Sequence, residues 1–117
     1  MSDVETLVGA WLTLPEVAEQ LGVPVTRARQ LVAERALLAL RRAENNALMV
    51  PADFVQDGQV LKGLQGTLML MLDARYSDDE AVRWLYTPDD SLPGSPVDAL
   101  VANRGTEVKR RAQALGF

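Results

Sequence analysis

The sequence predicts a mainly α-helical fold with a small β-hairpin in its first half. Three observations lead to this prediction. Apolar side chains recur at helical spacing on both sides of Gly22, two apolar segments flank a polar turn between residues 37 and 50, and further helix start signals follow in the second half. With 117 residues, of which 48% are hydrophobic, the chain suits one compact domain or two very small ones that share a core.

The first predicted helix begins after Thr13 and ends at Gly22. Thr13 can cap the free backbone N–H groups, and Glu16 stands three residues later, as a capping box requires. Leu12 and Val17 occupy the positions of a hydrophobic staple around this start. Gly22 supplies a left-handed stop, so we expect a helix of about two turns.

A second helix is expected directly after Pro24, which fixes the entry of the chain. Its apolar spacing continues through Ala28, Leu31 and Val32 to Arg35. Two short helices joined by a tight, glycine-containing turn form a helix-turn-helix, in which the first helix braces the second. The second helix of this motif is the one that can enter the major groove of DNA.

A β-hairpin is expected next, because residues 37–42 and 47–50 are apolar segments around the polar residues 43–46. A hairpin directly after the second helix would be a wing. Its DNA-side groups would then be Arg41, Arg42, Asn45 and Asn46. Arg41 and Arg42 could instead form an ordinary charged edge of a short strand.

The second half begins with a glycine-containing connection, residues 55–63, which is too short and too apolar for a free linker. Residues 64–76 then predict a helix whose apolar residues are nearly continuous and therefore largely buried, namely Leu68, Leu70, Met71 and Leu72. We place the division between residues 1–54, a winged helix-turn-helix domain, and residues 55–117, a C-terminal helical domain that shares its core.

Three more helices are expected after residue 76. Ser77 and Glu80 form a second capping box, and we interpret the acids at positions 78–80 as helix caps rather than as metal ligands. Ser95 caps another short helix, with Pro96 in its first turn. The last amphipathic helix covers residues 107–115, and its basic residues point outward: Lys109, Arg110 and Arg111.

The net charge of −4 hides two basic segments. Residues 25–42 contain five arginines against Glu34, and residues 104–117 contain four basic side chains against Glu107. Because binding to a polyanion depends on the local potential, the acidic total does not argue against nucleic acid as a partner.

Several classes of protein are excluded by residue type. The chain has no cysteine and no histidine, so it has no disulfide framework, zinc finger, cysteine nucleophile or Ser-His-Asp triad. It has neither a glycine-rich phosphate loop nor an acid pair in a compelling context, and we expect a protein without cofactor or enzymatic activity. An acidic N-terminus and the lack of a long apolar run indicate neither a signal peptide nor a membrane helix, so a cytoplasmic protein is expected.

The first half resembles the excisionase/MerR-like winged helix. The residues that carry this resemblance are Leu14-Pro15-Glu16-Val17-Ala18, Leu21-Gly22-Val23-Pro24, Leu31-Val32, Leu37 and Val50-Pro51-Ala52-Asp53. That family commonly has Ser at the position of Pro24, so the usual side-chain cap of the second helix is absent here. It often has an aromatic residue at the position of Arg29, which keeps a hydrogen-bond donor aimed at DNA.

The whole chain after about residue 12 resembles a small actinobacterial family of winged-helix DNA-binding proteins described as transcriptional regulators. The matching segments in the second half are residues 83–89, 91–92, 96–100 and 110–114, and those in the first half are 21–25 and 39–42. Residues 84–100 also resemble the C-terminal domain of Xre/ParS-type antitoxins, which holds a toxin. This second resemblance implies a shared helical packing more than a shared partner.

Together these observations predict a winged helix-turn-helix followed by a helical subdomain, and a sequence-selective protein for double-stranded DNA that acts in transcription at the nucleoid. The residues expected in the major groove are Thr26, Arg27, Arg29 and Gln30, and those on the wing are Arg41, Arg42 and Asn45. Arginine and glutamine suit guanine and adenine edges, since each can form paired hydrogen bonds there.

The alternative function is a protein-binding adaptor or antitoxin-like module whose C-terminal helices hold a protein partner. Trp84 would then be a docking anchor, although an aromatic residue at helical spacing is more often part of a core. The basic cluster at residues 109–111 could contact phosphates, favour a helix C-terminus or stay solvated. No heptad pattern is visible, so both a monomer and a homodimer remain open.

Overall fold

The computed structural model describes residues 3–42, 46–92 and 94–115. The first half contains α1 (Asp3–Val8), β1 (Trp11–Thr13), α2 (Leu14–Leu21), α3 (Val25–Ala33), β2 (Leu40–Arg41) and β3 (Leu48–Pro51), followed by the 3-10 turn η1 (Ala52–Phe54). The second half contains β4 (Val55–Gln56), β5 (Gln59–Val60), α4 (Leu64–Asp73), α5 (Asp78–Tyr86), α6 (Pro96–Val101) and α7 (Gly105–Ala114). The predicted fold class, mainly helical with a small β-wing, is confirmed.

The first helix of the motif, α2, begins as predicted. The backbone N–H of Glu16 donates to Oγ1 of Thr13 at 3.2 Å, and the N–H of Thr13 donates back to Oε1 of Glu16 at 2.8 Å. Both bonds lower the pKa of Glu16 below its usual value, and the bond from the Thr13 backbone N–H has the larger effect. Gly22 ends the helix with a φ of 70°, a conformation that glycine adopts without strain.

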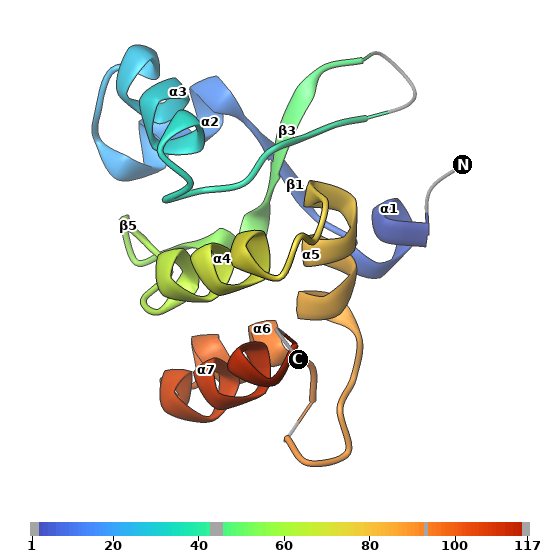
Figure 1. Ribbon diagram of the computed structural model, residues 1–117. Coiled ribbons are helices and arrows are strands. Elements are labelled where there is room, and N and C mark those ends of the chain that lie inside the picture. Colours follow the sequence, from blue (N-terminus) through green and yellow to red (C-terminus); the bar gives the residue numbers. More distant parts are fainter. Residues whose placement is uncertain (1–2, 43–45, 93, 116–117) are drawn as a thin grey trace.

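The second helix, α3, ends earlier than its apolar spacing predicts. It begins after Pro24 without a side-chain cap and stops at Ala33. The prediction that Arg35 continues the helix is wrong, because Arg35 lies beyond it with a φ of 63°. Its guanidinium instead forms an ion pair with Asp78, the first residue of α5. Figure 1 shows α2 and α3 together at one end of the molecule.

The wing is a three-stranded antiparallel sheet with the order β1-β3-β2. Leu12 pairs with Val50 and Leu40 with Met49, so β3 lies in the centre. The hairpin was predicted, but its first strand is shorter than residues 37–42, because residues 37–39 pass through the core instead. The third strand, β1, was not predicted.

The connection after the wing is itself structured. Residues 55–60, predicted as part of an irregular connection, form the two-stranded hairpin β4–β5. Asp57 and Gly58 form its turn with φ values of 51° and 76°. The hairpin packs against α2, and so it joins the two halves of the chain.

The helix α4 is less buried than predicted. Leu68 and Met71 are buried, but Leu72 is 42% exposed, as is Met69. The prediction that Leu72 is buried is therefore wrong, and Leu70 is only half-buried. The helix also ends at Asp73 rather than at residue 76.

The second half is assembled from short, capped helices. The predicted capping box Ser77–Glu80 is formed, and the predicted cap residue Ser95 forms a further capping box with Asp98. Among the described residues, no helix is long and apolar enough to cross a lipid bilayer. The helix α1, which was not predicted, packs against α5 through its buried residues Val4 and Val8.

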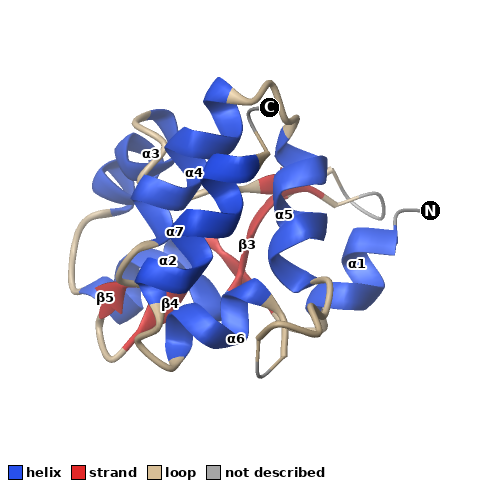
Figure 2. Cartoon of the chain, turned by 60° about the horizontal axis from the view of Figure 1, so that its bottom comes forward, coloured by secondary structure: helices blue, strands red, loops and turns tan. Residues whose placement is uncertain are grey.

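One hydrophobic core runs through both halves, as predicted. The core includes Val17 and Val50 from the first half and Leu85 and Val108 from the second. In Figure 1, α4 and α5 lie between the helix-turn-helix end and the end formed by α6 and α7. Figure 2 shows β3 in the middle of the molecule, with helices on either side. The helix-turn-helix therefore shares one hydrophobic core with the C-terminal helices.

Candidate nucleic-acid interface

The four residues predicted for the major groove all lie on the solvent-facing side of α3. Ala28 and Leu31 are buried against the core. Val25 and Val32 are partly buried, whereas the four predicted residues are exposed, namely Thr26, Arg27, Arg29 and Gln30. The helical period therefore separates a packing face from a free polar face.

Two of these four side chains are tied to each other. Nη1 of Arg27 donates to Oε1 of Gln30 at 2.8 Å, and the same atom lies 3.6 Å from Oε1 of Glu34. Arg29 differs, because its guanidinium has no hydrogen-bond or ion-pair partner within the described part of the chain. Arg29 can thus meet a ligand without first breaking an internal contact.

Arg29 and Arg41 line the same surface hollow. This hollow, of about 410 Å³, lies between the start of α2, the exposed side of α3 and the wing. Thr13, Leu14 and Pro15 form its wall on the α2 side, and its wing side is formed by Arg41 with Ala47 and Leu48. The fold therefore brings one basic residue of the helix-turn-helix and one of the wing to a common depression.

The two arginines of the wing have different surroundings. Arg41 is exposed, and its Nη1 donates to the backbone carbonyl of Asn46 at 2.8 Å, which links β2 to the residues that precede β3. Arg42 is half-buried, and its guanidinium carbon lies 5.3 Å from the centre of the Trp11 ring. Such a cation–π contact fixes the direction of the side chain. The predicted wing residue Asn45 lies outside the described residues.

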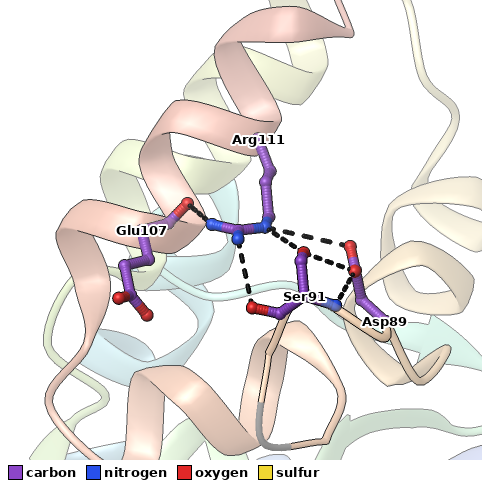
Figure 3. Close-up of polar contacts among 4 residues, drawn as sticks. All are labelled: Asp89, Ser91, Glu107 and Arg111. Carbon is purple, nitrogen blue, oxygen red and sulfur yellow. Dashed lines mark hydrogen bonds and ion pairs between the residues drawn. The ribbon is translucent and has the colours of Figure 1, made fainter.

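The third basic residue of the C-terminal cluster does not point outward as predicted. Nε of Arg111 donates to Oγ of Ser91 at 2.9 Å, and Nη2 donates to the Ser91 carbonyl at 3.2 Å. Nη1 donates to the carbonyl of Glu107 at 2.8 Å, and Oδ2 of Asp89 lies 3.9 Å from Nε (Figure 3). Arg111 therefore fastens the α5–α6 loop to α7.

The carboxylate of Asp89 belongs to the same cluster. Hydrogen bonds from Ser91, and more weakly the charge of Arg111, hold the pKa of Asp89 below its usual value. Lys109 and Arg110 stay exposed. Figure 1 places α7 at the end of the molecule opposite to α2 and α3, so this cluster is separate from the hollow that contains Arg29.

Two features of this interface were not predicted from the sequence. The start of α2 lines the hollow, and Trp11 lies beneath Arg42. A strand of three residues is too short for an alternating pattern to stand out, so β1 could not be found from periodicity. Because β1 was not predicted, the contact between Trp11 and the wing residue Arg42 could not be predicted either.

Two family models match the chain over consecutive segments. Residues 2–55 match the model described as "DNA-binding protein Rv2175c, wHTH domain". Residues 61–116 match the "Rv2175c C-terminal domain of unknown function".

A similar protein and its solved structure agree with these matches. The chain is 45% identical over 117 residues to the DNA-binding protein Rv2175c of Mycobacterium tuberculosis (strain ATCC 25618 / H37Rv), and the match covers 89% of this chain and 79% of that protein. The NMR structure of Rv2175c has a TM-score of 0.82 at 42% identity, over 92% of this chain and 82% of that one.

Proposed function

The chain belongs to the family of the actinobacterial winged helix-turn-helix protein Rv2175c, and from this premise we propose that it binds double-stranded DNA in a sequence-selective way and regulates transcription. The related mycobacterial protein is named as a DNA-binding protein. The observation that carries the proposal to this chain is the shared hollow of Arg29 and Arg41. A helix in the major groove and a wing on the backbone require basic groups from both elements on one face.

In this proposal α3 enters the major groove. Thr26 and Arg29 contact base edges directly, and Arg29 is suited to the paired acceptors of guanine. Arg27 and Gln30 are held together by their hydrogen bond of 2.8 Å, so they meet the DNA as a unit. Glu34 lies close to Arg27 and weakens nonspecific attraction to phosphate, which favours selectivity.

The wing follows the phosphate backbone. Arg41 is exposed beside the hollow and contributes a phosphate contact. Arg42, whose guanidinium lies over the ring of Trp11, contacts a second DNA phosphate in this proposal. Asn45 is kept as a proposed wing contact. We keep residues 1–54 as the DNA-binding domain and residues 55–117 as its helical support, and we place the protein in the cytoplasm, at the nucleoid.

No separate function as a protein-binding adaptor is proposed. Leu85, Leu92 and Leu100, which contribute to the resemblance to antitoxin domains, are buried in the core. Trp84 is half-buried against the same core. The three leucines are occupied by packing and are not available as docking anchors.

The proposal is tested by selecting bound sequences from a random duplex pool with the full chain. An enriched motif is expected, and its length and symmetry show whether a monomer or a homodimer binds, because two half-sites lie about one helical turn apart. Selection with Arg29→Ala is expected to lose the preference at one or two positions. A pool that stays random after repeated rounds with the unmodified chain would overturn the proposal.

A further inference from the structure

A second hollow lies between the beginnings of α4 and α7, away from the interface described above. Its volume is about 340 Å³, and its lining includes Lys62, Gly63, Gly66, Thr106 and Lys109. Lys62 and Lys109 are the two lysines of the chain, and the fold brings both to this place. Figure 1 shows α4 and α7 side by side, and the two helices are in contact.

The charge of this hollow stands out in an acidic protein. The chain has 16 acidic residues, yet none of the described residues that line the hollow is acidic. Neither lysine ammonium has a partner in residues 3–42, 46–92 or 94–115. By contrast, Nε of the neighbouring Arg104 lies 3.1 Å from Oε2 of Glu107, so that arginine is neutralised. The hollow therefore carries two lysine charges that no described side chain neutralises.

The walls of the hollow offer polar backbone and hydroxyl groups. Glycines at positions 63, 66 and 105 leave the backbone bare on both helices. A Cβ atom built on Gly66 would meet no atom within 4 Å, so the space in front of it is open. Oγ1 of Thr67 donates to the carbonyl of Gly63 at 2.9 Å and holds the α4 wall in place. Lysine ammonium groups beside bare backbone and a hydroxyl group are chemically suited to a phosphate group.

We propose that this hollow binds the phosphate group of a small phosphorylated molecule. Its volume is in the range of small-ligand sites. None of its described lining residues belongs to α3 or to the wing, so it is separate from the hollow that contains Arg29. The proposal does not depend on DNA binding.

The test uses inorganic pyrophosphate as the probe and the full chain, in an NMR titration of backbone amides at constant ionic strength. Saturable shifts are expected at residues 63–67 and 105–109. Lys62→Gln and Lys109→Gln should each weaken binding by about tenfold, the effect of losing one charge-assisted hydrogen bond. Gly66→Gln should abolish binding by filling the open space, and it keeps the helix because glutamine has the higher helix propensity.

Arg110→Gln is the matched control, because it removes one positive charge from the exposed residue next to Lys109 but not from the lining. It should leave the pyrophosphate affinity unchanged. Equal weakening by Arg110→Gln and Lys109→Gln, or the same shifts with chloride, would show nonspecific ion attraction and overturn the proposal. Shifts at these amides with a DNA duplex but not with pyrophosphate would also overturn it and assign the surface to DNA. Unchanged amide spectra of the free variants establish that all of them are folded.

Discussion

The phenol of Tyr86, the last residue of α5, donates a hydrogen bond of 2.9 Å to Oδ2 of Asp53 in η1, directly after the wing. The ring of Tyr86 also lies beside Phe54, with 6.3 Å between the ring centres. Since Tyr86 is buried, this contact joins the C-terminal helices to the end of the winged segment inside the core.

We expect Tyr86→Phe to lower the free energy of unfolding by about 1–2 kcal/mol, because it leaves the half-buried Asp53 carboxylate without this donor. Urea denaturation followed by circular dichroism measures the change. Tyr76→Phe is the control, since the Tyr76 hydroxyl has no hydrogen-bond partner among the described residues, and its stability should stay within about 0.5 kcal/mol of the parent. Equal losses in both variants would contradict a role for the bond.

Stability should also depend on Tyr86 at alkaline pH. Burial, and then the charge of Asp53, raise the pKa of Tyr86 in the folded chain above its usual value. The stabilisation from the neutral phenol is therefore complete below the unfolded pKa of about 10 and is lost as the pH rises above it. Between about pH 9 and 11, the parent should lose stability more steeply than Tyr86→Phe, as denaturation midpoints at each pH would record. Parallel curves would contradict this assignment.

Arg29→Ala should weaken binding to the selected DNA site by about 1–3 kcal/mol, because Arg29 has an unpartnered guanidinium on the exposed side of α3. Fluorescence anisotropy with a labelled duplex measures the affinity. Arg110→Ala removes the same charge from the far end of the molecule and is expected to change the affinity little. If the two variants weakened binding equally, only net charge would matter and Arg29 would not read a base.

The salt dependence of DNA binding tests the wing. With about five phosphate contacts, the logarithm of the affinity should fall against the logarithm of the salt concentration with a slope of about −4 to −5. Arg41→Gln should reduce the size of this slope by about 1 and weaken all sequences alike, because a phosphate contact carries no base preference. A slope near zero for the parent chain would refute the proposed mode of binding.

Arg111→Gln should destabilise the fold by about 1 kcal/mol without changing DNA affinity, because its guanidinium joins the α5–α6 loop to α7. The neighbouring exposed residue gives the control, Arg110→Gln, which should be neutral in thermal unfolding. Loss of DNA affinity in Arg111→Gln at a temperature where it is fully folded would show that this loop takes part in binding.

Features set by neighbouring residues were predictable from the sequence. The capping boxes at Thr13, Ser77 and Ser95 each depend on two residues three positions apart, and all three are formed. The exposed face of α3 follows from helical periodicity in the same way. Glycine at position 22 ends α2 because its own backbone can adopt a positive φ.

Features set by distant residues were not predictable. The ion pair from Arg35 crosses to Asp78, and Arg111 reaches back to Ser91. The elements α1, β1 and β4–β5 are two to six residues long, so they depend on packing against other elements rather than on their own propensity. The candidate interface could not be predicted for the same reason, because the hollow with Arg29 combines residues from α2, α3 and the wing.

The ion pair between Arg35 and Asp78 has a consequence for whether the two halves of the chain can be separated. It attaches Arg35, which follows α3, to the first residue of α5, so a helix encoded far downstream contacts the segment directly after α3. If residues 1–54 alone were fused to another protein, they would carry the DNA-facing side chains. They would lose the ion pair with Asp78 and the part of the core that residues 55–117 provide. The two halves are therefore expected to be inherited and exchanged together, with neither acting as a portable module.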